Sequence, residues 1–382
     1  MNQQEYTLGC AVWEFTLACN LRCEHCGSSA GKARKAELSH EEAMRLCDGL
    51  KEAGCLGVAL MGGEPFMRAD WHEVASRIRS NGMELSIITN GTTAPKDAIA
   101  KLKALSPRAV AVSIDAADPA LHDQIRGAKG AFDKAWAFID KASAAGLPVS
   151  VITTIHKKNI GQLAALRDML LNRGIAWQVQ TAGAEGDRFA RTNLLNEEEF
   201  YSVGVFLGTL KKMYTPKQLP AIGAHDLGYN SYIIPNLMLC EEWQGCQAGI
   251  SVLGIQSDGG VKGCLSMNSL AVEASVRERS VAEIWNDPKC FAYNRDFDPL
   301  ELGKNCSRCE FRLSCKGGCN EMSHMLTGHY HNDPMCFYKI EQKIFKEELA
   351  NPFKRFFMEA RRSMNRTIRS KRDLWGFFKG KR

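Results

Sequence analysis

Three cysteines near the N-terminus constrain this chain more than any other feature. Residues 19–26 read Cys-Asn-Leu-Arg-Cys-Glu-His-Cys, so Cys19, Cys23 and Cys26 have the spacing C-x3-C-x2-C, beside a strand-like run over 12–16. Soft thiolates at this spacing suit three corners of a four-iron cluster and leave one iron open to another ligand. The alternative is a zinc site in which His25 is the fourth ligand.

The composition is that of a globular chain with about two domains. The chain has 382 residues, of which 45% are hydrophobic and 24% are charged. It contains no apolar run close to the roughly 20 residues of a membrane span, and its first residues show no signal-peptide pattern. Fifteen cysteines in such a chain predict metal ligands in a reducing compartment rather than disulfides. We therefore expect a cytoplasmic protein.

Short apolar strands alternate with amphipathic helices through the first 215 residues. The expected strands cover 12–16, 58–61, 85–89, 109–113, 149–153 and 176–180. This alternation predicts an α/β fold with a parallel sheet and right-handed crossovers. About six strand–helix units fit, which is too few for an eight-unit barrel. We expect residues 184–235 to form a helical bridge, with a helix from Asn196 to about Met213.

Polar residues and glycines follow several of these strands, where parallel barrels carry their chemistry. Gly62, Gly63, Glu64 and Pro65 follow the second strand, and glycines there let the backbone approach a ligand closely. Asn90 follows the third strand, where it either lines the ligand pocket or forms a plain turn. Strand register also places Thr153 and Gln178 or Gln180 at this rim.

The cysteine motif resembles the signature of the radical S-adenosylmethionine (SAM) superfamily, in the branch that carries a C-terminal SPASM domain. The resemblance implies a partial (β/α)6 barrel, open on one side, in which SAM chelates the open iron and is cleaved to a 5′-deoxyadenosyl radical. It also implies that the GGEP turn binds the SAM amino group, with a contribution from Glu64. By the same resemblance Ser113 and Arg126 hold the SAM carboxylate, although Arg126 could equally be a surface charge.

A second group of cysteines lies in the C-terminal half. Eight thiolates are enough for two fully ligated four-iron clusters, and two zinc sites are the alternative. The run over 252–264 resembles the hairpin of a SPASM domain, and the spacing C-x2-C-x5-C-x3-C over 306–319 resembles its hallmark. The resemblance assigns four cysteines to a first auxiliary cluster, namely Cys240, Cys246, Cys264 and Cys319. It assigns four to a second, namely Cys306, Cys309, Cys315 and Cys336. Full ligation favours electron transfer over substrate binding.

We therefore predict three [4Fe-4S] clusters, SAM as cofactor, and three segments. These are a radical SAM barrel over 1–215, a bridge and SPASM domain over 216–345, and a basic aromatic tail over 346–382. Residues 351–382 contain eleven Lys/Arg and two acidic residues, a net charge of +9, so the rest of the +6 chain carries −3. This tail has three interpretations: a solvated end, a surface for an acidic peptide or partner, and a membrane or nucleic-acid contact.

The resemblance implies an oxidoreductase that matures a ribosomally made peptide or protein by oxidising a side chain. The alternatives are a tetrapyrrole side-chain-modifying enzyme and an anaerobic sulfatase maturase. Leu265 stands where sulfatase maturases of this type carry an aspartate, which argues against the latter. A zinc-stabilised nucleic-acid-binding protein is the non-enzymatic alternative. The net charge of −3 on residues 1–350 argues against it. Nucleic acid is therefore not an expected partner.

Two further expectations concern partners and catalysis. The cluster motif begins at residue 19, so leader recognition is expected from the tail or from a separate leader-peptide-binding protein. Electrons are expected from a reductase, flavodoxin or ferredoxin. No acid or base that acts on substrate is identified by the sequence, and Asp226, Tyr229 and Asp258 are the candidates.

Overall fold

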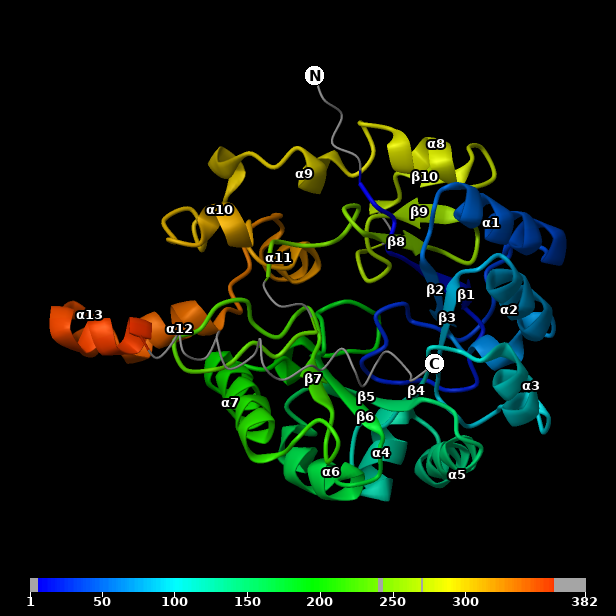
Figure 1. Cartoon of the computed structure of the whole chain (residues 1–382), viewed down its shortest axis with the longest axis horizontal. Helices are drawn as coiled ribbons and strands as arrows, with labels where there is room; N and C mark the ends of the chain where they lie inside the picture. Colours follow the sequence, from blue (N-terminus) through cyan, green and yellow to red (C-terminus); the bar gives the residue numbers. More distant parts are fainter. Residues whose placement is uncertain (1–5, 240–242, 269–270, 361–382) are drawn as a thin grey trace.

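The computed structural model describes residues 6–239, 243–268 and 271–360. Within these ranges ten strands form one sheet, in the order β10-β9-β8-β1-β2-β3-β4-β5-β6-β7 (Figure 1). The strands are β1 (Cys10–Thr16), β2 (Gly57–Gly62), β3 (Glu84–Thr89), β4 (Ala109–Ser113), β5 (Val149–Ile155), β6 (Ala176–Thr181), β7 (Ala221–Gly223), β8 (Val252–Ile255), β9 (Gly260–Lys262) and β10 (Ala274–Ser275). Strands β1 to β6 are parallel, which confirms the predicted six-strand partial barrel.

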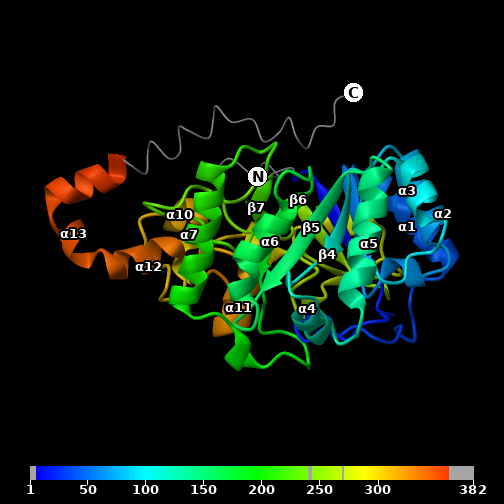
Figure 2. The same cartoon turned by 90° about the horizontal axis from the view of Figure 1, so that it is seen from below.

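Seven helices follow one another around the outside of these strands, in an arc from the right to the lower left of Figure 1. They are α1 (His40–Glu52), α2 (Trp71–Ser80), α3 (Ala98–Leu105), α4 (Pro119–Arg126), α5 (Ala131–Ala144), α6 (Leu163–Leu170) and α7 (Glu197–Met213). Figure 2 shows α5 on one side of strands β4 and β5, and α7 on the other side. Strand residues that face the helices, such as Trp13, Leu60, Ile87 and Trp177, are fully buried and form the core.

The C-terminal part contains short helices linked by loops. They are α8 (Val281–Asn286), α9 (Ala292–Arg295), α10 (Arg312–Cys315), α11 (Asn320–Thr327), α12 (Phe337–Ile344) and α13 (Lys346–Ala350). The predicted hairpin is present, because β8 pairs antiparallel with β9, and β8 also pairs in parallel with β1. The C-terminal domain therefore extends the sheet of the barrel.

Two local predictions need correction. The segment 184–235 is not purely helical, because β7 pairs in parallel with β6 and adds a seventh strand to the barrel side of the sheet. A strand of three residues is too short to show a sequence period. Helix α4 was also missed, although Asp118 accepts a hydrogen bond from the Leu121 N–H, Pro119 stands at its first position and Gly127 ends it.

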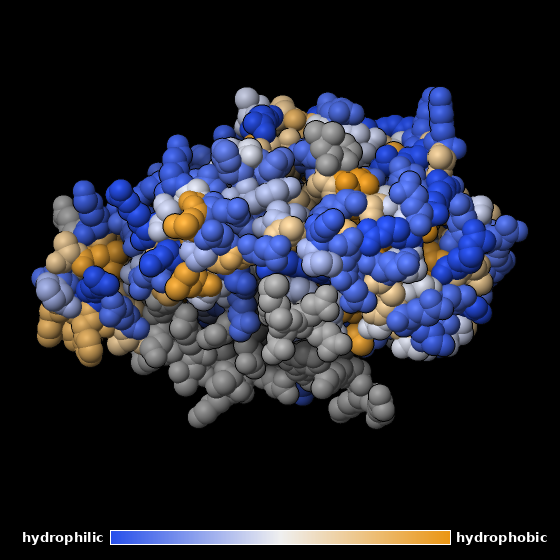
Figure 3. Space-filling view, turned by 90° about the horizontal axis from the view of Figure 1, so that it is seen from above, coloured by the Kyte–Doolittle hydropathy of each residue, from blue (hydrophilic) through white to orange (hydrophobic). Residues whose placement is uncertain are grey.

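The surface adds two observations. None of the described helices is both long and apolar enough to cross a membrane. Seen from above, the described surface is mostly hydrophilic, and apolar atoms gather at the left end, where α13 lies in Figure 1 (Figure 3). Phe353, Phe356 and Phe357 are exposed there by 72%, 64% and 56%. They belong to the predicted basic aromatic tail, whose residues 361–382 lie outside the described part of the chain.

Candidate active site and metal centres

The cysteine loop leaves β1 and folds back on itself. The Cys19 N–H donates to the Gly31 carbonyl at 3.1 Å, and Cys19, Cys23 and Cys26 share one small apolar cluster with Leu21 and Ala30. The Arg188 guanidinium, which the sequence did not single out, donates to the carbonyls of Cys23, Ser29 and Ala30 at 3.1, 3.4 and 3.3 Å. The loop is thus clamped with its three thiols gathered on one side, as the predicted cluster requires.

The GGEP turn, residues 62–65, is hydrogen-bonded to the first residues of this loop. The Gly63 N–H donates to the Thr16 carbonyl at 2.7 Å, and the Glu64 N–H donates to the Ala18 carbonyl at 2.8 Å. A Cβ atom would lie 2.4 Å from the Thr16 oxygen at Gly62, and 2.0 Å from the Ala18 oxygen at Gly63. Only glycine allows this approach, so the two glycines bring the turn and the cysteine loop together.

The Glu64 carboxylate is turned inward. It is fully buried and accepts hydrogen bonds from Thr89 Oγ1 and the Asn90 N–H, both at 2.7 Å. Burial raises the pKa of Glu64 to about 7, against the opposing effect of these hydrogen bonds. The side chain therefore ties the end of β2 to the end of β3, and Pro65 after it is buried. A role of Glu64 toward SAM stays a prediction.

Asn90 lies against the cysteine loop. Its Nδ2 donates to Asn20 Oδ1 at 2.9 Å and lies 3.9 Å from Cys19 Sγ. Its Oδ1 accepts from the Thr92 N–H at 2.8 Å. The residue is therefore more than a plain turn, because its side chain links the end of β3 to the first cysteine.

A buried ion pair lies on the other side of the loop. Arg126 Nε is 2.8 Å from Asp115 Oδ2, and Arg126 Nη1 is 3.6 Å from Cys23 Sγ. Burial tends to raise the pKa of Asp115, but the Arg126 guanidinium, His25, His122 and the Thr154 N–H together outweigh it and hold that pKa below its ordinary value. Arg126 is thus buried beside the loop, which excludes the alternative of a surface charge. Ser113, the half-buried last residue of β4, precedes Asp115 by two positions.

His25 belongs to the same group. Its Nε2 lies 3.6 Å from Asp115 Oδ2, and its ring lies 5.8 Å from that of His156. Burial lowers the pKa of His25 to about 4, so the ring is neutral at neutral pH. Asp115 was not predicted from the sequence; a charged residue two positions after a buried strand was the available signal.

The inner face of the barrel carries one charged residue along β2 to β6, Glu84 at the amino end of β3, which pairs with Arg108. The other residues on this face are uncharged: Ala59, Met61, Ser86, Ile88, Ala109, Ala111, Ser113, Ser150, Ile152, Thr154, Gln178 and Gln180. Gln180 Nε2 donates to Thr154 Oγ1 at 3.1 Å, so both lie on this face. Thr153 does not, because its hydroxyl donates to the Ile114 carbonyl and accepts from Trp177 Nε1 within the core.

Two of the three proposed catalytic candidates have structural tasks. Asp226 Oδ2 accepts from the Thr181 N–H and from Thr181 Oγ1, both at 2.6 Å, and so caps the end of β6. Asp258 Oδ1 accepts from the Gly260 N–H at 3.1 Å and shapes the turn between β8 and β9. A catalytic role for either stays a prediction.

His225 lies next to Asp226, at the carboxyl end of β7, and is half exposed. Its Nε2 is 3.3 Å from Glu321 Oε2 on α11, and the ligating atoms of His225, Glu321 and Cys319 lie within 4.8 Å of one another. His225 was not among the site residues predicted from the sequence. The missing signal was Glu321, which is 96 positions away.

Three of the four cysteines of the predicted first auxiliary centre come together. Cys246 and Cys264 share an apolar cluster with Met267, and the thiols of Cys246 and Cys319 are in hydrogen-bonding contact. Cys319 stands at the start of α11. The fourth predicted ligand, Cys240, lies outside the described residues.

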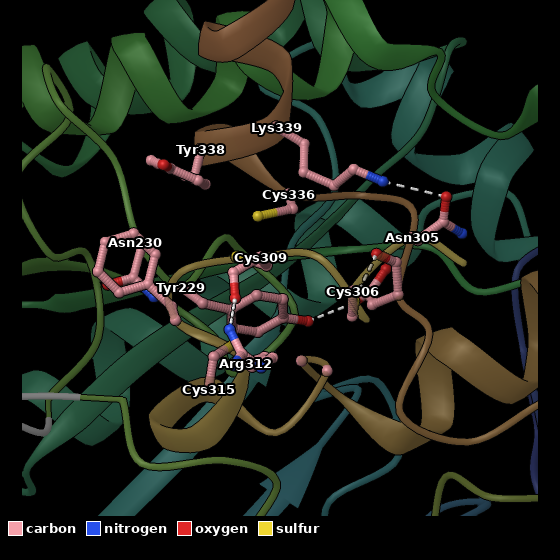
Figure 4. A pocket seen from close by; sticks show the side chains of 14 residues that line it. Tyr229, Asn230, Asn305, Cys306, Cys309, Arg312, Cys315, Cys336, Tyr338 and Lys339 are labelled. Carbon is pink, nitrogen blue, oxygen red and sulfur yellow. Dashed lines mark hydrogen bonds between the residues drawn. The ribbon is translucent and has the colours of Figure 1, made fainter. Parts of the chain in front are cut away.

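All four cysteines of the predicted second auxiliary centre line one pocket (Figure 4). They are Cys306, Cys309, Cys315 and Cys336, and no disulfide joins them in the described structure. Cys315 is buried, whereas Cys306 and Cys309 are half-buried. Four thiols around one small cavity fit the ligand set of a four-iron cluster.

Tyr229, the third catalytic candidate, lies between the two auxiliary cysteine sets. Its hydroxyl donates to Asp333 Oδ2 and accepts from the Cys319 N–H at 2.9 Å, and its ring lies 4.6 Å from that of Trp243. The Asp333 carbonyl lies 4.0 Å from Cys306 Sγ. Burial raises the pKa of Asp333 to about 7. Tyr229 and Asp333 therefore form a buried link between Cys319 and Cys306.

Comparison with known proteins agrees with this geometry. The model of the radical SAM superfamily matches residues 13–170, and that of an iron-sulfur cluster-binding (SPASM) domain matches residues 246–310. The chain is similar to the Fe-coproporphyrin III synthase of Methanosarcina barkeri, with 30% identity over 87% of this chain and 88% of the relative. It is also similar to the mycofactocin maturase MftC of Mycobacterium ulcerans, with 36% identity over 81% and 82%.

Among solved structures, Streptococcus suis SuiB bound to S-adenosylmethionine has the same fold, with a TM-score of 0.68 at 18% identity over 87% of this chain and 76% of SuiB. Family membership makes the chain an enzyme and replaces the alternative of a zinc-stabilised nucleic-acid-binding protein. The gathered thiols, the GGEP turn, the six-strand barrel and these matches lead to one conclusion: the chain belongs to the radical SAM superfamily and carries a C-terminal SPASM domain.

Proposed function

We propose that the protein oxidatively modifies a side chain of a ribosomally made peptide or protein. The observation that carries the proposal is the inner face of β2 to β6, which is uncharged beyond Glu84 at the amino end of β3 and where Ser113, Thr154, Gln178 and Gln180 supply hydrogen-bonding groups. Amides and hydroxyls of this kind suit a peptide backbone. The relative MftC is a maturase. The structural neighbour SuiB has been solved bound to the precursor peptide SuiA.

The chain would hold three [4Fe-4S] clusters. Cys19, Cys23 and Cys26 would bind the first, and the auxiliary sets would bind the other two, with Cys240 as the remaining ligand. With SAM bound and one electron supplied by a flavodoxin, a ferredoxin or a reductase, the first cluster would supply a 5′-deoxyadenosyl radical that takes one hydrogen atom from the substrate. The second hydrogen would leave as a proton, and its electron would pass to the auxiliary clusters.

The residues around the loop would position SAM for this chemistry. Gly62 and Gly63 bring backbone groups next to the loop, and we assign the SAM amino group to that turn. Ser113 and Arg126 would bind the SAM carboxylate, since arginine suits bidentate pairing with a carboxylate. Asp115 holds the Arg126 guanidinium beside Cys23, next to the cysteine loop. The arrangement encloses the reacting groups between the loop and the inner face of β2 to β6.

Mass spectrometry of a small peptide encoded beside this gene and co-expressed with the enzyme tests the proposal. Loss of two hydrogens with wild type, and no change with a Cys19→Ala/Cys23→Ala/Cys26→Ala variant, is the expected result. Gain of one deuterium in heavy water would indicate epimerisation instead. An unmodified peptide, although the reduced enzyme still cleaves SAM, would overturn it.

Tetrapyrrole modification is the second candidate, because the similarity to the Fe-coproporphyrin III synthase covers most of both chains. A tetrapyrrole carries several carboxylates, for which the inner face of β2 to β6 offers no cation. Incubation of the reduced enzyme with SAM and iron coproporphyrin III, followed by product mass analysis, distinguishes the two. Sulfatase maturation is disfavoured, because Leu265 stands where sulfatase maturases carry an aspartate. Leu265 is buried, and its carbonyl accepts from Lys262 Nζ at 2.8 Å.

A further inference from the structure

A helix at the end of the described chain stands apart from the barrel. Asn351 caps it, because its Oδ1 accepts from the N–H groups of Phe353 and Lys354 at 3.0 and 3.2 Å, and Pro352 stands at its first position. We call residues 352–360 the aromatic helix. Figures 1 and 2 place α13 and the end of the described chain at the edge of the molecule, away from the strands. The helix is therefore free to contact a surface outside the molecule.

Three phenylalanines of this helix contact one another and are open to solvent. Phe353, Phe356 and Phe357 are each more than half exposed. The rings of Phe353 and Phe357 lie 4.9 Å apart, and those of Phe356 and Phe357 lie 5.8 Å apart. None of the three belongs to an apolar core cluster of the described residues. Adjacent exposed aromatic rings of this kind mark a surface that contacts a partner or a membrane.

The sequence continues the apolar spacing of the aromatic helix. Positions i, i+3 and i+4 of a helix are neighbours, so the three phenylalanines share one face. Ala360, Met364 and Ile368 follow Phe357 at intervals of three to four residues. Basic residues stand between these apolar positions, at Lys354, Arg355, Arg361, Arg362, Arg366 and Arg369. An apolar stripe with basic residues on the other side is typical of a helix that lies in the plane of a membrane surface.

The charge of the C-terminal end favours an anionic surface even when every acidic residue is counted. From Lys346 onward the chain has twelve basic and four acidic residues, a net charge of +8, and the acidic ones are Glu347, Glu348, Glu359 and Asp373. Glu359 pairs with Arg355 at 2.8 Å, and Glu310 is a further acidic neighbour of Arg355. Residues 361–372 contain six basic residues and no acidic one. The surplus of positive charge therefore follows directly after the exposed phenylalanines.

We infer that the aromatic helix and the basic stretch 361–372 dock on an anionic lipid surface. The phenylalanines would enter the boundary between headgroups and acyl chains, and the basic side chains would contact lipid phosphates. A lipid surface fits better than a protein partner, because a flat, deformable surface can cover three outward rings at the edge of the molecule without a matching pocket. Trp375, Phe377 and Phe378 add aromatic residues of the kind that is enriched at membrane interfaces. The inference is independent of the peptide substrate.

Flotation of the full-length holoenzyme with lipid vesicles tests the inference. Wild type should float with vesicles of equal parts phosphatidylglycerol and phosphatidylcholine, should not float with phosphatidylcholine alone, and should be released by added salt, because salt screens the charges. Phe353→Ser/Phe356→Ser/Phe357→Ser should weaken binding to the anionic vesicles by more than about tenfold. Arg361→Gln/Arg362→Gln should weaken it about thirtyfold, at about 1 kcal/mol for each basic residue near the lipid surface.

Matched variants distinguish docking from damage. Leu56→Ser/Met213→Ser/Leu300→Ser removes three exposed apolar side chains from other parts of the molecule and should leave vesicle binding unchanged. Iron content and SAM cleavage by the reduced enzyme confirm that each variant is intact. Phe356→Trp should keep the affinity, and vesicles with brominated acyl chains should quench its added fluorescence. Equal vesicle binding for the two triple-serine variants, no quenching of the added tryptophan, or equal binding to neutral and anionic vesicles would overturn the inference.

A failed membrane test and a failed peptide test remain distinguishable, because vesicle binding needs no peptide, SAM or reductant. An enzyme that ignores vesicles but binds polyglutamate, and loses that binding in Arg361→Gln/Arg362→Gln, would overturn the inference in favour of an acidic protein partner. An enzyme that ignores vesicles but binds duplex DNA would overturn it in favour of nucleic acid. Peptide modification would stand in each of these cases.

Discussion

The buried pair of Asp115 and Arg126 leads to the strongest stability prediction. Asp115 is fully buried, Arg126 is 7% exposed, and their atoms are 2.8 Å apart. Asp115→Asn removes the countercharge but keeps an oxygen that can accept from the Thr154 N–H, now at 3.0 Å. Arg126 cannot lose its proton and would stay charged in a buried site.

The magnitude follows from that burial. Breaking a buried pair by removing one partner costs about 3–5 kcal/mol. We expect about 3 kcal/mol for Asp115→Asn, at the lower end of that range, because the Thr154 hydrogen bond survives and Cys23 stays beside the guanidinium. Urea unfolding of the anaerobically reconstituted protein, followed by tryptophan fluorescence, measures the change, since Trp13 and Trp177 are buried in the barrel.

Two comparisons make this prediction refutable. Asp48→Asn removes the partner of Arg77 in an exposed pair and should change the stability much less. The double variant Asp115→Asn/Arg126→Gln removes both charges and should be more stable than the sum of the two single changes predicts. The reasoning fails if Asp115→Asn costs no more than Asp48→Asn, or if the single changes simply add.

Three further predictions concern residues around the metal centres. Tyr229→Phe removes the hydroxyl shared by Cys319 and Asp333, so the free energy of unfolding should fall by about 1–3 kcal/mol, measured by urea titration, and iron should be lost to a chelator faster. Arg188→Ala should speed the chelator-driven bleaching of the SAM-binding cluster, because three loop carbonyls lose their donor. Glu64 holds a proton in the folded protein between its unfolded pKa of 4.5 and about 7. Wild type should therefore lose stability relative to Glu64→Gln as the pH rises through that window, by about 3 kcal/mol in all; a pH-independent difference would contradict this.

The barrel was predictable because its signals are local. The apolar strands and the capping box of Ser39 and Glu42 lie in continuous stretches of sequence, and the structure shows both. Strand β7 escaped prediction because its three residues show no period, and its identity depends on pairing with β6. Periodicity within a segment can be seen in one sequence, whereas pairing between distant segments cannot.

The site followed the same division. The family resemblance implied which four thiols belong to the second auxiliary centre, and in the structure these four line one pocket. The side chains that hold the site had no such spacing: Arg188 acts on a loop 165 positions away, and Glu321 meets His225 across 96. The prediction that Thr153 lies at the rim was wrong, because Thr153 shares the core-facing side of β5 with Val149 and Val151 and its hydroxyl accepts from the Trp177 indole.

Sheet continuity explains how the metal centres are kept in a defined relation. Strand β8 pairs with β1 in parallel from Cys10 to Trp13, and β1 leads directly into the cysteine loop. The C-terminal domain is thus joined to the radical site by backbone hydrogen bonds as well as by side-chain packing. Glu14 of β1 adds to the joint, since its carboxylate accepts from the Ser257 hydroxyl at 2.9 Å and pairs with Arg34. A displacement of the β8–β9 hairpin relative to the barrel would have to break this ladder, so the position of the hairpin is set by the sheet rather than by a hinge.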